Sequence, residues 1–189
     1  MPIQEYQEKW LEDFKAIKSV IDDALMNLNI SIEHIGSTAV PKLAAKPIID
    51  IDIVYENNVP FEAVKKGLEK IGYYHNGNQG IINREVFKRG MWGNKHQILD
   101  TITHHLYACP VDSEELQRHI TFRNYLIANE AAKTEYQQLK YEIAEAANQD
   151  KKQYAALKEM KARAFINSII EKADLEYNYK SITKLSASK

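Results

Sequence analysis

Cysteine, glycine and proline are scarce in this chain of 189 residues, which contains 1, 7 and 5 of them respectively. The single cysteine, Cys109, excludes a scaffold of internal disulfides, so a buried core must hold the fold. With 44% hydrophobic residues, the chain can build that core in one domain of ordinary size. Internal repeats, low-complexity tracts and long linkers are also missing, which favours one packed unit.

A charge of one sign is missing as well, because 25 basic residues balance 26 acidic ones and leave a net charge of −1. No clustered run of Lys and Arg with interleaved aromatic residues appears, which argues against a nucleic-acid partner. No apolar run approaches the ~20 residues of a membrane span, and the N-terminus, MPIQEYQEKW, does not resemble a signal peptide. We therefore expect a soluble, cytoplasmic protein without a membrane partner; its oligomeric state stays open.

Hydrophobic periodicity divides the first 110 residues into helices and strands. Helical spacing of apolar residues predicts two amphipathic helices, and alternating or continuous apolar residues between glycines and prolines predict strands. The predicted helices span residues 6–28 and 60–71, and the predicted strands span residues 30–35, 47–55, 73–75, 84–89 and 98–109.

After Pro110 the pattern becomes entirely helical, with helices expected over residues 113–128, 130–147 and 151–172. The predicted fold class is α/β (α+β), with a small mixed β-sheet flanked by helices and a C-terminal helical segment. We expect a single domain over residues 1–175, with the sheet core at about 30–109 and the helical segment at about 112–172. Residues 176–189 have weak periodicity and are predicted to be a frayed tail.

Two carboxylates stand in the most apolar of the predicted strands. Asp50 and Asp52 alternate with Ile49, Ile51 and Ile53, so both aspartates project to one side of the strand. Paired acids of this kind either bind a metal ion or lie on a solvated sheet face. Asp50 and Asp52 are thus candidate ligands for Mg²⁺ or Mn²⁺, which would bridge the phosphates of a nucleotide.

A Gly-Ser turn precedes these acids. Gly36 permits a close approach of the backbone to a phosphate, and the hydroxyl of Ser37 can bind a phosphate oxygen. Thr38 follows directly and is included in the predicted phosphate-binding turn. The 12 residues between Ser37 and Asp50 suffice for a short helix and a return to the adjacent strand. The turn and the acids can therefore meet.

The segment from His34 to Ile53, HIGSTAVPKLAAKPIIDIDI, resembles the GrpB family within the nucleotidyltransferase superfamily. Shorter similarities to that family extend the resemblance over most of the chain: Arg84 with Phe87 and Lys88, HHLY at 104–107, FRNYL at 122–126 and YQQLK at 136–140. The resemblance implies a small mixed sheet flanked by helices, with a nucleotidyltransferase-like site.

Active members of the wider superfamily often carry a third carboxylate on a later strand, and this sequence has no obvious one. The inward positions of the strand before Cys109 are Thr103, His105 and Tyr107, so His105 takes the place of the third acid as a candidate catalytic residue. A neutral imidazole binds metals but adds no negative charge. Asp100 and Glu85 are the alternative acids.

Basic residues near the acidic strand are candidates for holding phosphate. Lys46 directly precedes that strand, and Arg84 and Lys88 share one face of another because they are four residues apart. The alternative for Lys46 is that it only shields the aspartates, and the alternative for Arg84 and Lys88 is an ordinary charged strand surface. His34 is similarly a candidate ligand-orienting residue or a packed structural histidine.

The hypothesis from the sequence is a metal-dependent nucleotidyltransferase that moves a nucleotidyl group from a nucleoside triphosphate to a hydroxyl of an acceptor that the sequence does not identify. Without a third acid, a catalytically silent nucleotide-binding or regulatory module is the first alternative. The second is an interaction protein that binds a partner through the C-terminal helices.

Overall fold

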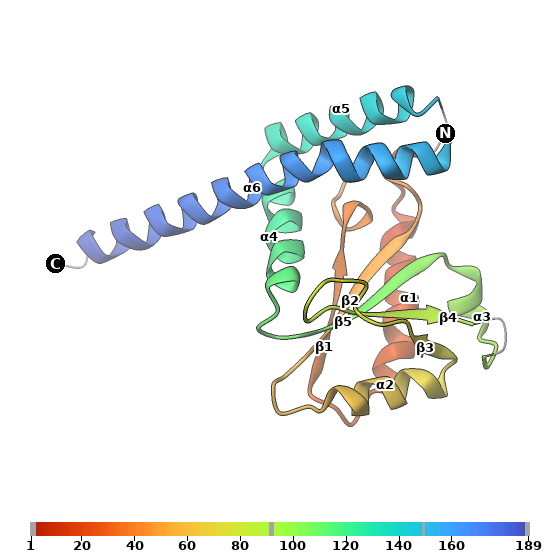
Figure 1. Ribbon diagram of the computed structural model, residues 1–189. Coiled ribbons are helices and arrows are strands. Elements are labelled where there is room, and N and C mark those ends of the chain that lie inside the picture. The colour runs from red at the N-terminus through yellow and green to blue at the C-terminus, as the bar shows by residue number, and fades with distance from the viewer. Residues whose placement is uncertain (1–2, 91–92, 149, 188–189) are drawn as a thin grey trace. The chain divides into compact units, whose positions relative to one another are not determined.

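We describe a computed structural model of the chain (Figure 1), which covers residues 3–90, 93–148 and 150–187, with backbone alone at Lys151 and over 177–187. By their internal contacts, the residues form two compact units. One comprises residues 4–120, and the other is built from residues 121–189 together with the first three residues. In the described part of the chain, no helix combines the length and the apolar character needed to cross a membrane.

The first unit contains a five-stranded mixed sheet in the order β1-β2-β5-β4-β3. The strand pairs β1–β2, β5–β4 and β4–β3 are antiparallel, whereas the central pair β2–β5 is parallel. Its strands are β1 (Ile30–Ile35), β2 (Ile49–Tyr55), β3 (Tyr73–His75), β4 (Glu85–Arg89) and β5 (His104–Pro110), and its helices are α1 (Lys9–Ala24), η1 (Ser37–Ala39), α2 (Phe61–Lys70) and α3 (Gln97–Thr101).

One face of the sheet forms the hydrophobic core with α1 and α2 (Figure 1). Ile49, Ile51 and Ile53 point to this face from β2, and Leu106 joins them from β5. They pack against apolar residues that recur at helical spacing on α1 (Trp10, Phe14, Ile17, Ile21) and on α2 (Val64, Leu68). We call this side the core face and the opposite side the site face.

Helix α4 (Glu114–Ala128) starts in the first unit, where Ser113 accepts a hydrogen bond from the backbone of Leu116 in the manner of an N-cap. Leu116 packs with Val54 and Cys109 of the site face. In the second unit, α5 (Glu130–Ala146) and α6 (Lys151–Ala187) run side by side (Figure 1). Stacked rings of Tyr136 and Phe165 join these two helices.

The predicted fold class is confirmed: a mixed sheet is flanked by helices and followed by a helical segment. One element was wrong, because residues 98–101, predicted as strand, form α3; the side chain of His96 accepts from the backbone of Leu99 at its start. Helix α6 also continues past residue 172 to Ala187, since no glycine or proline interrupts it. The expected frayed tail concerns this backbone and residues 188–189, which are not described.

Candidate functional site

The register of the central strands brings the predicted acidic pair and the predicted histidine to the site face. Asp50 of β2 lies opposite His105 of β5, and Asp52 lies opposite Tyr107. Opposed residues of neighbouring strands share a face. The prediction that Asp50, Asp52 and His105 lie on one face is therefore confirmed.

The Gly-Ser turn contacts the first of these acids. Gly36 has φ 70° and ψ −167°, a backbone conformation that only glycine adopts readily. A Cβ atom on this residue would lie 2.5 Å from Oδ2 of Asp50, so the side chain of any other residue would collide with the carboxylate. The predicted meeting of the turn and the acids is confirmed at Gly36 and Asp50.

Thr38 supports the turn from within. It is buried, and its hydroxyl donates to the carbonyl of Ile48 at 3.3 Å, just before β2. The hydroxyl oxygen accepts from Nε2 of His34 at 3.0 Å, and the His34 ring stacks on Phe14. The hydroxyl of Thr38, predicted to bind phosphate, thus bonds inside the chain, whereas Ser37 and Lys46 remain half-buried.

Asp50 is paired with a histidine that solvent reaches. Nδ1 of His105 lies 2.8 Å from Oδ1 of Asp50, and because a carboxylate only accepts, the ring donates. The His105 side chain is 54% exposed and that of Asp50 29%. Oriented in this way, a neutral His105 presents Nε2 as a proton acceptor toward solvent.

Asp52, in contrast, is fully buried and bonded to a histidine of α4. Its Oδ2 accepts from Nδ1 of His119 at 2.8 Å, and Nε2 of that ring lies 3.3 Å from Oε1 of Glu115. The other oxygen of Asp52, Oδ1, is buried and has no hydrogen-bond partner in the described part of the chain.

The charge state of this cluster follows from its contacts. Burial alone would lower the pKa of His119, but hydrogen bonds to Asp52 and Glu115 outweigh it and raise that pKa to about 9. The bond to His119 lowers the pKa of Glu115, while burial raises that of Asp52. We assign an imidazolium to His119 at neutral pH, because the hydrogen bonds to the two acids stabilise its charge.

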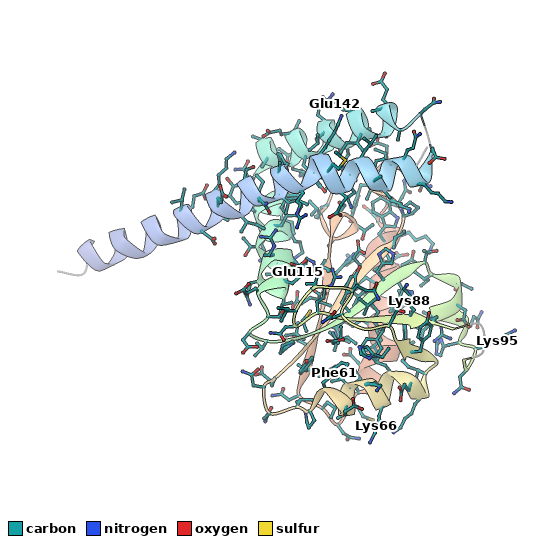
Figure 2. All side chains as sticks on the ribbon, in the orientation of Figure 1. Phe61, Lys66, Lys88, Lys95, Glu115 and Glu142 are labelled. Carbon is teal, nitrogen blue, oxygen red and sulfur yellow. The ribbon has the colours of Figure 1, made fainter. Side chains whose placement is uncertain are left out.

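Arg84, just before β4, lies over the ring of Tyr107, 4.8 Å from its centroid. Its Nη1 is 4.0 Å from Oε1 of Glu115, and its Nε is buried without a hydrogen-bond partner among the described residues. Lys88 is exposed on β4 (Figure 2) and shares the site face, because Val86 pairs with Tyr107. Arg84 and Lys88 together form a basic edge of the site face, in which the Nε donor of Arg84 has no partner among the described residues.

The alternative third acids do not reach the site. Glu85 pairs with Ala108 on the core-face side and bonds His75, while Asp100 of α3 bonds Arg89. Among the described residues, no group of three or more His, Cys, Asp or Glu side chains is arranged to hold a metal ion. Of the expected ligands, the site face thus offers the two aspartates.

Two residues of the site, His119 and Glu115, were not predicted from the sequence. His119 lies 67 residues from Asp52 in the sequence, so no local motif joins them. One signal was available, because Leu116 and Ile120 mark the packed side of α4 and His119 is three residues after Leu116. A histidine on the packed side of α4 is expected to face the sheet.

Fold and site together define a mixed α/β protein with two histidine-bonded aspartates beside a glycine turn. Residues 1–172 match the family model described as GrpB protein, and the chain therefore belongs to the GrpB family. A crystal structure of the conserved protein GrpB from Enterococcus faecalis is similar to this chain, with a TM-score of 0.73 and 34% identity, covering 93% of this chain and 98% of that one.

Two curated relatives are also similar to the chain. UPF0157 protein YqkA of Bacillus subtilis (strain 168) is 35% identical over 139 residues, which are 74% of this chain but only 38% of YqkA. Glutamate-rich protein GrpB of Alkalihalophilus pseudofirmus is 31% identical over 168 residues, which cover 87% of this chain and 91% of that protein. The chain thus spans less than half of YqkA and nearly all of the second relative.

Proposed function

We propose that this protein is a metal-dependent nucleotidyltransferase that moves a nucleotidyl group from a nucleoside triphosphate to a hydroxyl of an acceptor. The observation that carries this proposal is the close approach of Gly36 to Asp50, on the face that also holds Asp52. A glycine turn against paired strand acids supplies backbone for phosphate and carboxylates for a cation in one place.

The residues fit a divalent cation. Oδ1 of Asp52 is a buried carboxylate oxygen without a hydrogen-bond partner in the described residues. Because an unsatisfied buried acceptor is unfavourable, a cation bound at this oxygen would stabilise it. Asp50 keeps Oδ2 beside Gly36 while Oδ1 bonds His105. Asp50 and Asp52 would hold Mg²⁺ or Mn²⁺ by carboxylate oxygens, with phosphate oxygens completing the shell. The cation would supply positive charge that stabilises the phosphates during transfer.

Phosphate binding is assigned to the turn and to the basic edge. Gly36 and Ser37 offer backbone and hydroxyl donors, and the buried Nε of Arg84, which has no partner among the described residues, offers a charged one. Lys46 and exposed Lys88 would add positive charge nearby. The burial of Arg84 against Tyr107 fixes its direction, so little order is lost when an anion binds.

For the transfer, the acceptor hydroxyl attacks the α-phosphorus in line. The new P–O bond forms as the bond between the α-phosphorus and the bridging oxygen breaks, and pyrophosphate leaves with that electron pair. Nε2 of His105 receives the hydroxyl proton, since Asp50 holds the ring by Nδ1. Positioning and electrostatics carry this reaction without a covalent enzyme intermediate.

Calorimetric titration of Mg²⁺-ATP and Mg²⁺-GTP tests the proposal. We expect magnesium-dependent binding to the wild type and none to the Asp50→Asn variant, because the change removes one carboxylate ligand. Asp50 is only half-buried, so the variant should still fold. Asp23→Asn, the same change at an exposed position of α1, is the matched control and should bind like the wild type. Equal binding by Asp50→Asn, in a well-folded state, would reject the site.

One observation favours a second candidate, a catalytically silent nucleotide-binding module. Each aspartate already bonds a histidine, and among the described residues no third carboxylate is arranged with them to hold a metal ion. Incubation of the protein with labelled ATP or GTP and hydroxyl-bearing acceptors separates the two candidates. Recovery of unaltered nucleotide from a binding-competent protein would favour the silent module, and a nucleotidylated acceptor the enzyme.

A further inference from the structure

We infer that His119, anchored by Glu115, is a positioning residue that turns the carboxylate of Asp52 so that Oδ1 receives the cation. This inference rests on the proposed function of the same site. It adds two residues of α4 that have no place in the sequence pattern of Gly36, Asp50 and Asp52.

The two oxygens of Asp52 are in different situations. Oδ2 accepts from Nδ1 of His119 at 2.8 Å, whereas Oδ1 has no partner in the described residues. The side chain is 0% exposed, so water from bulk solvent does not satisfy Oδ1. A carboxylate held by one oxygen and left open at the other is oriented for a ligand at the open one.

His119 itself is held from both ends. Nε2 lies 3.3 Å from Oε1 of Glu115, one helical turn earlier on α4, so the ring spans two carboxylates. Arg118 also approaches Glu115, with Nε 3.5 Å from Oε2, and Nη1 of Arg84 lies 4.0 Å from Oε1. These contacts fix the ring plane and therefore the direction of the bond to Asp52.

A second histidine–carboxylate pair provides a matched control. Nε2 of His75 bonds Oε2 of Glu85 at 2.6 Å, on the core-face side of the sheet. The exposures of these side chains, 25% and 23%, are close to the 23% of both His119 and Glu115. Substitution of His75 therefore removes a similar pair without touching the candidate cation site.

The test measures Mn²⁺ binding by electron paramagnetic resonance, so that neither substrate nor turnover is needed. Removal of a residue that orients a metal ligand typically weakens metal binding about 10–100-fold, and we expect a loss of that size for His119→Ala. His75→Ala should retain the affinity of the wild type. Circular dichroism establishes that each variant is folded before it is titrated.

His119→Ala leaves a buried carboxylate without a donor and is at risk of not folding. Two polar variants then decide. His119→Asn places an amide nitrogen near the position of Nδ1 and keeps the bond to Asp52, whereas His119→Gln reaches the position of Nε2 and Glu115 instead. We expect Asn to retain Mn²⁺ affinity within roughly threefold and Gln to lose about tenfold or more.

The outcomes separate this inference from the proposed function. Mn²⁺ binding that is lost in Asp50→Asn but unchanged, or tighter, in His119→Ala or His119→Gln keeps the site and overturns the role of His119. Absence of Mn²⁺ binding by the folded wild type overturns the proposed function, and the pair of Asp52 and His119 is then structural only.

Discussion

The two faces of the central sheet are formed by the same strands but differ in what their side chains do. On the core face, Ile49, Ile51 and Ile53 are buried among apolar side chains, and their contribution is to stability. On the site face, the intervening Asp50 and Asp52 bond histidines, and Asp52 is completely buried, with one oxygen that has no partner in the part of the chain that the structure describes. A buried carboxyl oxygen without a partner among the described residues costs stability. The core face therefore contributes to stability in a way that the site face does not.

The largest effect should follow from a change on the core face. Ile51 is fully buried on β2, and Ile51→Ala removes its side chain from the packed core. We expect a loss of about 2–5 kcal/mol in the free energy of unfolding, measured by urea denaturation. Asp50→Asn, one position away, should cost far less. Similar losses for the two variants would remove the distinction between the faces.

The charge of His119 on the site face should make the free energy of unfolding depend on pH. Because the folded-state pKa of His119 is raised from 6.5 to about 9, its stabilising contribution is complete below pH 6.5 and is lost as pH rises through 9. The loss should be about 2–3 kcal/mol, measured by urea denaturation at pH 6.5 and 9.5. The raised pKa of Asp52 acts in the same direction at lower pH. His119→Asn should lack most of this dependence, and a flat profile in the wild type would contradict the assigned imidazolium.

Gly36→Ala tests whether the turn and the acid form one unit. The backbone strain and the collision with Asp50 should cost roughly 2–3 kcal/mol and abolish nucleotide binding. Gly77 has nearly the same φ, 71°, with nothing within 4 Å of its added Cβ. Gly77→Ala should therefore cost only about 1 kcal/mol of strain and leave binding unchanged. Denaturation and calorimetry measure both quantities, and equal effects of the two variants would discount the contact with Asp50.

The smallest effect is expected at Thr38. Thr38→Val keeps the shape but removes the hydroxyl that joins His34 to Ile48, at a cost of about 1–2 kcal/mol for the unsatisfied groups. Because the turn loosens, nucleotide affinity should fall severalfold but not vanish. Calorimetry measures that affinity, and Thr38→Ser, which restores the hydroxyl, should recover it. Complete loss of binding in a folded Thr38→Val would instead place the hydroxyl on the nucleotide.

The sequence was most informative where its pattern is local. The alternation along β2 predicted that Asp50 and Asp52 share a face. The turn at Gly36 is separated from them by a single connection between neighbouring strands, so their contact was also predictable. His119 was not predicted, because helical periodicity shows that α4 packs but not which strand it meets. The α3 segment was predicted as a strand from its apolar residues alone. Two polar residues favour the helical turn instead, because the side chain of His96 accepts from the backbone of Leu99 and the side chain of Asp100 accepts from the backbone of His96.

The most direct test observes the histidine rings by NMR while Mg²⁺-ATP or Mg²⁺-GTP is added. Ring resonances of His105 and His119, on the site face, should shift until they saturate, whereas those of His75, on the core-face side, should not shift. Shifts at His75 with none at His105 or His119 would place the nucleotide elsewhere and reject the proposed site.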